Sequence, residues 1–166
     1  MSSNNRKPFE LLVPAGSLEA LSAAIGEGAD AVYLGLKDFN ARIRAKNFSY
    51  NQFEAIVDKL HSKKKKIYVT LNTVFEEREA PQIYNLLKYL SLVKPDAIIV
   101  QDTGIINMCS KFFPEINIHA STQANISSAE GLNFLSRYNV KRVVLSRELD
   151  LTQIKQIKAN SSAEIE

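Results

Sequence analysis

Short hydrophobic runs alternate along the chain with longer segments in which apolar residues recur at helical spacing. The runs predict strands at residues 10–13, 31–34, 67–71, 97–101, 116–119 and 142–145. Several are apolar at nearly every position, as in AIIV before Gln101, which is typical of parallel strands covered on both faces. Alternation of strands and helices over the whole chain indicates a parallel α/β fold.

The segments between the strands predict amphipathic helices. In the second of them, Phe53, Ile56, Val57 and Leu60 fall on one face. Three helices begin with the pattern of a capping box, in which side chains satisfy amides that the first turn leaves unpaired: Ser49 with Gln52, Ser127 with Glu130, and Asp150 with Gln153.

Six strand–helix units are compatible with two architectures, an open doubly wound sheet and a (β/α)8 barrel of which only part is present. Barrels of this type typically need about 250 residues, and this chain has 166. The chain ends on AEIE, where an apolar residue between acids predicts the start of a seventh strand. We therefore expect the chain to be part of a longer protein.

Composition narrows the class of protein. The net charge of +3 is too small to indicate nucleic-acid binding by itself. A single cysteine excludes an intramolecular disulfide and fits a reducing cytoplasm. No apolar stretch reaches the roughly 20 residues that span a bilayer, and the polar opening MSSNNRKPFE does not resemble a signal peptide. We expect a cytoplasmic protein with no membrane partner.

Polar residues follow every predicted strand, where the active face of either architecture lies. We expect these residues to bind substrate: Asn40, Arg42, Asn72, Gln101, Asp102, Ser121, Gln123, Arg147 and Glu148. Helix caps explain part of the pattern, because they favour Ser, Asp and Asn. Capping does not require Gln101, Gln123 or Arg147. The loop that contains Arg42, Arg44 and Lys46 is the best candidate for binding an anion.

His119 and Cys109 are candidates for a chemical role. His119 ends the fifth predicted strand. It is either an acid–base group at the barrel mouth or a hydrogen-bonded histidine that lines the barrel. Cys109 shares an apolar helix face with Ile105 and Ile106, which favours a buried thiol over a nucleophile. No metal site is predicted. The run Lys63 to Lys66 is expected to be solvated, on the end of the barrel opposite the pocket.

Seven segments, in order and spanning residues 10 to 149, resemble the signature blocks of the U32, or collagenase-like, peptidase family: ELLVPAGSLEAL, GADAVYLGL, FNARIRAKNFS, IYVTLNTV, DAIIVQDTG, IHASTQANISS and KRVVLSREL. The resemblance implies a TIM-type barrel with a substrate pocket at the carboxyl ends of its strands. We therefore expect an α/β fold, the first six β-α units of a (β/α)8 barrel, with residues 1–9 as a polar tail and 10–166 as the partial barrel.

The resemblance also implies a chemistry. In better understood branches of the family, conserved cysteines hold an iron–sulfur cluster. The reaction in these branches is oxygen-independent hydroxylation of tRNA, rRNA or a quinone precursor. Prephenate is associated with the RNA branch. Cys109 alone cannot hold a cluster that normally takes four cysteines. A 4Fe-4S cluster is therefore expected from cysteines beyond residue 166 of the intact protein.

The expected function is the N-terminal barrel portion of an enzyme that hydroxylates RNA, for example at a tRNA uridine. The 166-residue form alone is expected to be inactive. One alternative is a collagenase-like peptidase with a peptide at the same strand ends, although no GxSxG or HExxH motif is present. The other is a non-enzymatic six-stranded binding module. An interrupted barrel would also leave open edges through which copies could associate.

Overall fold

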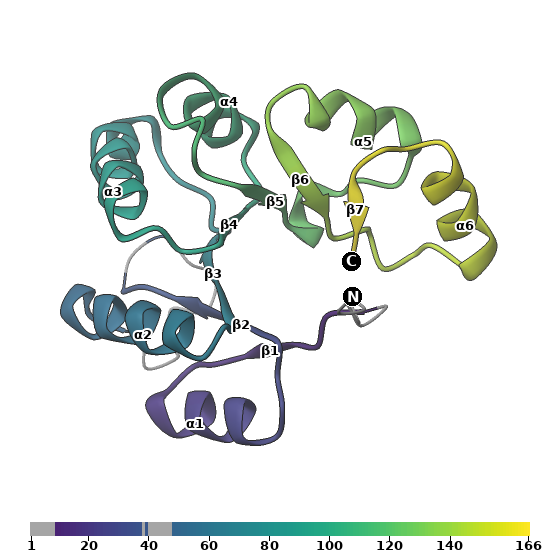
Figure 1. The fold of residues 1–166 in the computed structure, drawn as a ribbon. Helices are drawn as coiled ribbons and strands as arrows, with labels where there is room; N and C mark the ends of the chain where they lie inside the picture. Colours follow the sequence, from purple (N-terminus) through teal and green to yellow (C-terminus); the bar gives the residue numbers. More distant parts are fainter. Residues whose placement is uncertain (1–8, 38, 40–47) are drawn as a thin grey trace, which may run out of the picture.

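A computed structural model describes residues 9–37, 39 and 48–166, in which parallel strands alternate with helices (Figure 1). The strands form one sheet in chain order: β1 (Leu12–Pro14), β2 (Ala31–Gly35), β3 (Lys66–Leu71), β4 (Ala97–Val100), β5 (Ile118–Ala120), β6 (Val140–Val143) and β7 (Glu164–Ile165). Every neighbouring pair is parallel, from β1 with β2 to β6 with β7.

The helices lie on the outer side of the curled sheet (Figure 1). They are α1 (Leu18–Gly26), α2 (Tyr50–Ser62), α3 (Ala80–Val93), α4 (Thr103–Phe112), α5 (Ala129–Ser136) and α6 (Leu151–Ala159), with two 3-10 turns, η1 (Glu77–Glu79) and η2 (Thr122–Ala124). Within the described ranges, no helix is long and apolar enough to cross a bilayer. A curled parallel sheet inside a layer of helices is part of a TIM-type barrel, as predicted.

The predicted strands are confirmed in number and order, and the seventh predicted at the chain end is β7. Their bounds needed correction. The first begins at Leu12 and not at Glu10, the fifth at Ile118 and not at Ile116, and the sixth at Val140 and not at Arg142. The sixth was misplaced because Lys141 and Arg142 interrupt its hydrophobic run, although strand residues alternate between two faces.

The main core fills the space between the sheet and the helices. Alternate strand residues face outward, such as Val32, Ile67 and Ile98, and each has no exposed surface. The helices bury the faces predicted from their periodicity, as in α2, where Phe53 and Leu60 are at most 2 % exposed. This double coverage explains why the strands are continuous hydrophobic runs.

A second, smaller cluster fills the inside of the curled sheet. It consists of Ala31, Tyr68, Ala97 and Ile99, with Leu12 and Tyr33 packed against it. Tyr68 is in register with Tyr33 on one side and Ala97 on the other, so these side chains face the same way. The alanines leave room beside the tyrosine ring, and the inside is a packed core, as expected for a barrel.

Helix caps decide where the outer helices begin. Ser49 with Gln52 and Asp150 with Gln153 form capping boxes, as predicted. The predicted box of Ser127 with Glu130 is wrong by one residue, because the hydroxyl of Ser128 accepts the hydrogen bond from the Gly131 amide at 3.1 Å. Pro81 lies in the first turn of α3, where a missing amide hydrogen costs nothing.

Candidate functional site

The carboxyl ends of the strands meet at one end of the curled sheet, which we call the rim. Among the predicted substrate-binding residues, Asn72 follows β3, Gln101 and Asp102 follow β4, Ser121 and Gln123 follow β5, and Arg147 and Glu148 follow β6. The parallel strands therefore bring the described members of this set to the same end of the fold. Asn40 and Arg42, with Arg44 and Lys46, lie outside the described residues.

Two rim residues, Asp102 and Ser121, have structural roles. The Asp102 carboxylate caps α4 by accepting hydrogen bonds from the amides of Gly104 at 2.7 Å and Ile105 at 3.0 Å. Ser121 is buried, and its hydroxyl accepts a hydrogen bond from the Gln123 amide at the start of η2. Capping therefore explains the residue types at these two positions.

The remaining rim residues carry polar groups that caps do not use. Gln123, Arg147 and Glu148 are exposed, and Asn72 and Gln101 are partly exposed. Arg147 and Glu148 form no ion pair with each other, although both lie in the described part of the chain. Amides and a guanidinium at the mouth of a barrel can bind the polar edges and anionic groups of a substrate.

His119 lies inside the curled sheet, below the rim. It is 5 % exposed, and its ring meets the Tyr68 ring edge to face at 4.6 Å between centroids. Burial, followed by the positive charge of Arg142, lowers the pKa of His119 to about 4, so the ring is neutral near pH 7. Its Nδ1 atom has no hydrogen-bond partner among the residues that the structure describes. A proton-transfer role for His119 stays a prediction.

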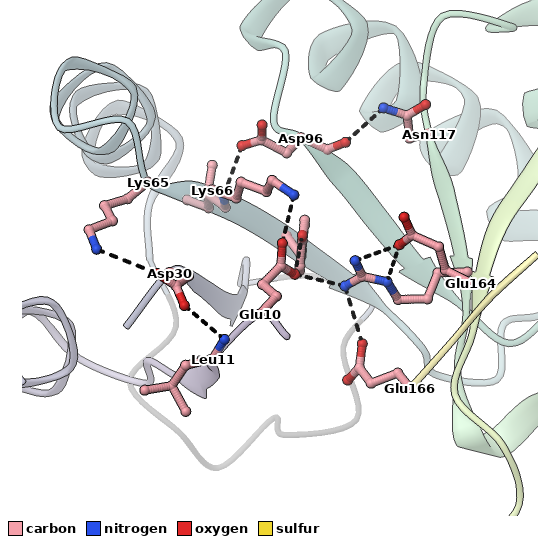
Figure 2. A network of polar contacts seen from close by, with 12 residues as sticks. Glu10, Leu11, Asp30, Lys65, Lys66, Asp96, Asn117, Glu164 and Glu166 are labelled. Carbon is pink, nitrogen blue, oxygen red and sulfur yellow. Dashed lines mark hydrogen bonds and ion pairs between the residues drawn. The ribbon is translucent and has the colours of Figure 1, made fainter. Parts of the chain in front are cut away.

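An ion network that the sequence did not predict lies inside the curled sheet and joins the amino ends of β1 and β3 to β6 and β7. We call Glu10, Lys66, Tyr68, Arg142, Glu164 and Glu166 the interior ion network (Figure 2). Glu10 is at its centre and accepts hydrogen bonds from Lys66 at 2.6 Å, the Tyr68 hydroxyl at 2.6 Å and Arg142 at 2.8 Å.

Burial and hydrogen bonding oppose each other at Glu10. Burial alone would raise the pKa of this carboxyl, but hydrogen bonds from Lys66, Tyr68 and Arg142 lower it to about 2. Arg142 also bonds to Glu164 at 2.7 Å, and its guanidinium lies 5.6 Å from the centre of the Tyr68 ring. The network therefore connects β3, β6 and β7 through Glu10, the residue that lies two positions before β1.

The signal for the network was present in the sequence but weak. Lys66 and Arg142 are charged residues within or next to hydrophobic strands, which marks them as unusual. The run Lys63 to Lys66 predicts solvated side chains, but the Lys66 ammonium bonds to Glu10 at 2.6 Å. Lys65 also has a partner, Asp30, at 4.0 Å. Nothing in the sequence connects Arg142 with Glu10.

The described residues do not fit an iron–sulfur cluster or another metal centre. Within the described ranges, no group of three His, Cys, Asp or Glu side chains could hold a metal ion. Cys109 is fully buried, as predicted, and burial raises the pKa of its thiol to about 12. A neutral, enclosed thiol cannot serve as a thiolate ligand.

Comparison with known sequences gives the family. The sequence profile of peptidase family U32 matches residues 16–166. The chain belongs to this family. Its resemblance to the U32 signature blocks is thereby confirmed. A solved U32 peptidase has the same fold, with a TM-score of 0.74 over 99% of this chain and 71% of that chain at 14% identity.

Named relatives in the family differ in activity. An uncharacterized protease of Methanocaldococcus jannaschii is 40% identical over 91% of this chain and 36% of its own length. The tRNA hydroxylation protein P of Escherichia coli is 36% identical over 90% of this chain and 33% of its own. A 23S rRNA 5-hydroxycytidine C2501 synthase of the same organism is 41% identical over 95% of this chain and 24% of its own length. The chain thus spans about a third or less of these relatives.

Proposed function

We propose that this chain is the amino-terminal barrel portion of an enzyme that hydroxylates a base of RNA, for example a tRNA uridine. The observation that carries the proposal is the identity of 36% and 41% with relatives named for tRNA hydroxylation and 5-hydroxycytidine synthesis in rRNA. Both alignments cover at least 90% of the chain.

In this proposal the rim binds and orients the RNA. The amides of Asn72, Gln101 and Gln123 donate to and accept from the polar edge of the base, and Arg147 binds a phosphate or carboxylate. Asp102, Ser121 and Glu148 complete the described part of the surface, and Asn40 and Arg42 are proposed to extend it. A small carboxylate such as prephenate is a second ligand for the same arginines.

The cofactor belongs to the proposal for the intact protein. We propose a 4Fe-4S cluster on cysteines beyond residue 166, because Cys109 is the single cysteine of this chain and is buried. Such a cluster supplies electron transfer when bound. The residues of this chain would contribute substrate binding and not cluster ligands. The single cysteine also fits the reducing environment of the cytoplasm, which is where we propose the protein works.

The proposal is tested in cells that lack the gene for the intact protein. Their tRNA and rRNA are digested to nucleosides and analysed by mass spectrometry. One pyrimidine nucleoside that is heavier by an oxygen atom should disappear, and the wild-type gene should restore it. Arg147→Ala should restore less of it at an unchanged protein level, because Arg147 is exposed. An unchanged set of hydroxylated nucleosides in the deletion strain would refute RNA hydroxylation.

A peptidase is the second candidate, because one relative is named a protease. Proteolysis by a serine–histidine pair would need an exposed imidazole next to a free hydroxyl. His119 is buried, and its pKa of about 4 makes it a weak base. The Ser121 hydroxyl also accepts a hydrogen bond from the Gln123 amide, so this pair is poorly suited. Cleavage of gelatin by the purified, metal-defined intact protein would favour the peptidase over the RNA enzyme. The third candidate, a non-enzymatic six-stranded binding module, predicts a monomer that unfolds cooperatively and has neither activity.

A further inference from the structure

A groove of about 860 Å³ lies on the outer side of the rim, between α2, α3 and the residues that follow β2 and β3. Lys37 and Phe39 come from the segment after β2, and Thr73 and Val74 from the segment after β3. Its volume is within the range of about 300–1,000 Å³ that small-molecule sites occupy. The groove therefore adjoins the surface proposed above to bind RNA.

Aromatic side chains line one side of the groove. The rings of Tyr50 and Tyr89 meet edge to face, with centroids 4.8 Å apart. Tyr89 is held in place by Phe53, at 6.4 Å between ring centroids, and by the bond from its hydroxyl to the Tyr50 carbonyl. Tyr50 remains 42% exposed. Fixed rings with exposed surface are what a flat ligand needs for stacking.

Phe39 adds a sign of backbone strain at the same place. Its φ of 58° is in the left-handed region, which is unfavourable for a bulky side chain. Such conformations persist where the surrounding structure holds them, and they cluster at ligand-binding sites. Val74, opposite, is 85% exposed although it is apolar.

Polar groups line the other side. Gln82 and Asn85 are three residues apart on α3 and both are exposed, so their amides project from one helix face. Each amide offers both donors and acceptors, as the edge of a nucleobase does. Lys37 adds a positive charge and Glu79 a negative one. The Glu79 carboxylate accepts a hydrogen bond from the Glu76 amide at 2.6 Å. Charges of both signs disfavour a bare anion and favour a base with one neighbouring phosphate.

We propose that this groove binds one unstacked base of single-stranded RNA, with the base against Tyr50, its edge at Gln82 and Asn85, and a phosphate at Lys37. The proposal rests on the RNA-modifying function above and adds where the strand lies beside the rim. Recognition of splayed bases by aromatic rings and amides is the usual way in which proteins read unpaired RNA.

The test measures binding of the intact protein to a fluorescent, unpaired oligoribonucleotide by anisotropy, beside a fully paired RNA hairpin. Tyr50→Ala should weaken binding of the unpaired strand by about tenfold and leave hairpin binding unchanged. The matched control is Tyr84→Ala, since Tyr84 is 39% exposed, close to the 42% of Tyr50, but lies on α3 and contacts Phe112, outside the groove. Tyr84→Ala should bind like the wild type.

A second pair of variants removes the risk that Tyr50→Ala acts through folding. Val74→Asp puts a negative charge in the groove, and Leu92→Asp puts one at the far end of α3. The two native side chains are 85% and 73% exposed. Val74→Asp should weaken binding of the unpaired strand severalfold more than Leu92→Asp does. Equal binding within both pairs would overturn the proposal.

The nucleoside assay, run on the same variants, separates this proposal from the proposed function. If the wild type modifies RNA and all four variants bind alike, the groove proposal fails and the function stands. If the wild-type protein binds no RNA and modifies none, both fail. If an unstructured aromatic peptide binds with Tyr50-dependent affinity and the affinity for the unpaired oligoribonucleotide does not depend on Tyr50, the groove is a peptide site and the RNA proposal is overturned.

Discussion

Glu10→Gln removes one negative charge from the interior ion network while keeping the size of the side chain. Glu10 accepts hydrogen bonds from Lys66, Tyr68 and Arg142, and its side chain is 19% exposed. The substitution leaves the Arg142 guanidinium, 12% exposed, with Glu164 and Glu166 as its carboxylate partners. Because those two are more exposed, at 67% and 36%, they compensate the charge less well than Glu10 does.

The pKa of Glu10 gives the magnitude. It falls from 4.5 to about 2 on folding, which corresponds to ~3 kcal/mol at 1.36 kcal/mol per pH unit. Because Glu10 and Lys66 are in part exposed to solvent, screening reduces this to about 1–2 kcal/mol. A carboxyl whose pKa is lower in the folded state stabilises the fold above its unfolded pKa. That contribution is complete above about pH 5 and is lost as the pH falls towards 2.

The assay is urea unfolding of the intact protein, followed by circular dichroism between pH 7 and pH 3. Glu10→Gln should lower the free energy of unfolding by about 1–2 kcal/mol at pH 7, and the difference should shrink below pH 4.5. Glu76→Gln is the matched control, since Glu76 pairs with Arg78 at the surface, 66% and 80% exposed. It should change stability by less than about 0.5 kcal/mol. Equal effects of the two substitutions, or a difference independent of pH, would refute the reasoning.

Three further predictions concern single residues. Arg142→Met should destabilise the fold by about 3 kcal/mol in the same assay, because it leaves Glu10 buried with fewer donors; an unchanged urea midpoint would contradict this. Asp102→Asn should retain the cap of α4 and the thermal midpoint of unfolding. A loss of RNA hydroxylation in this variant would show that the Asp102 charge binds substrate, whereas full activity would restrict Asp102 to capping. Cys109 should react with iodoacetamide only after unfolding, because burial raises its pKa to about 12; rapid labelling of the native protein, read by mass spectrometry, would disprove its enclosure.

Local patterns predicted most of the fold. The strands, the faces of the helices and the burial of Cys109 follow from apolar spacing within about ten residues. The caps at Ser49 and Asp150 follow from spacing within four residues. The cap at Ser128 was missed by one position because two serines compete there and only the backbone geometry selects between them.

Features that join distant segments could not be predicted in this way. The groove combines side chains from α2, α3 and two rim segments, so no single stretch shows it. The dual nature of Asp102 and Ser121 is a related difficulty, since capping and substrate binding favour the same residue types. The substrate roles of the rim residues stay predictions until the proposed variants are measured.

The bond between Glu10 and Arg142 joins residues that are 132 positions apart, and this separation has a consequence for synthesis on the ribosome. Each strand pairs with the one made just before it, so the sheet can grow as the chain emerges. Glu10, by contrast, waits for Arg142 while the ribosome adds the intervening residues, which takes on the order of ten seconds. During that interval the first strand–helix units are held by their neighbours alone. The amino-terminal end of the barrel therefore gains its full set of ion pairs only after β6 has been made.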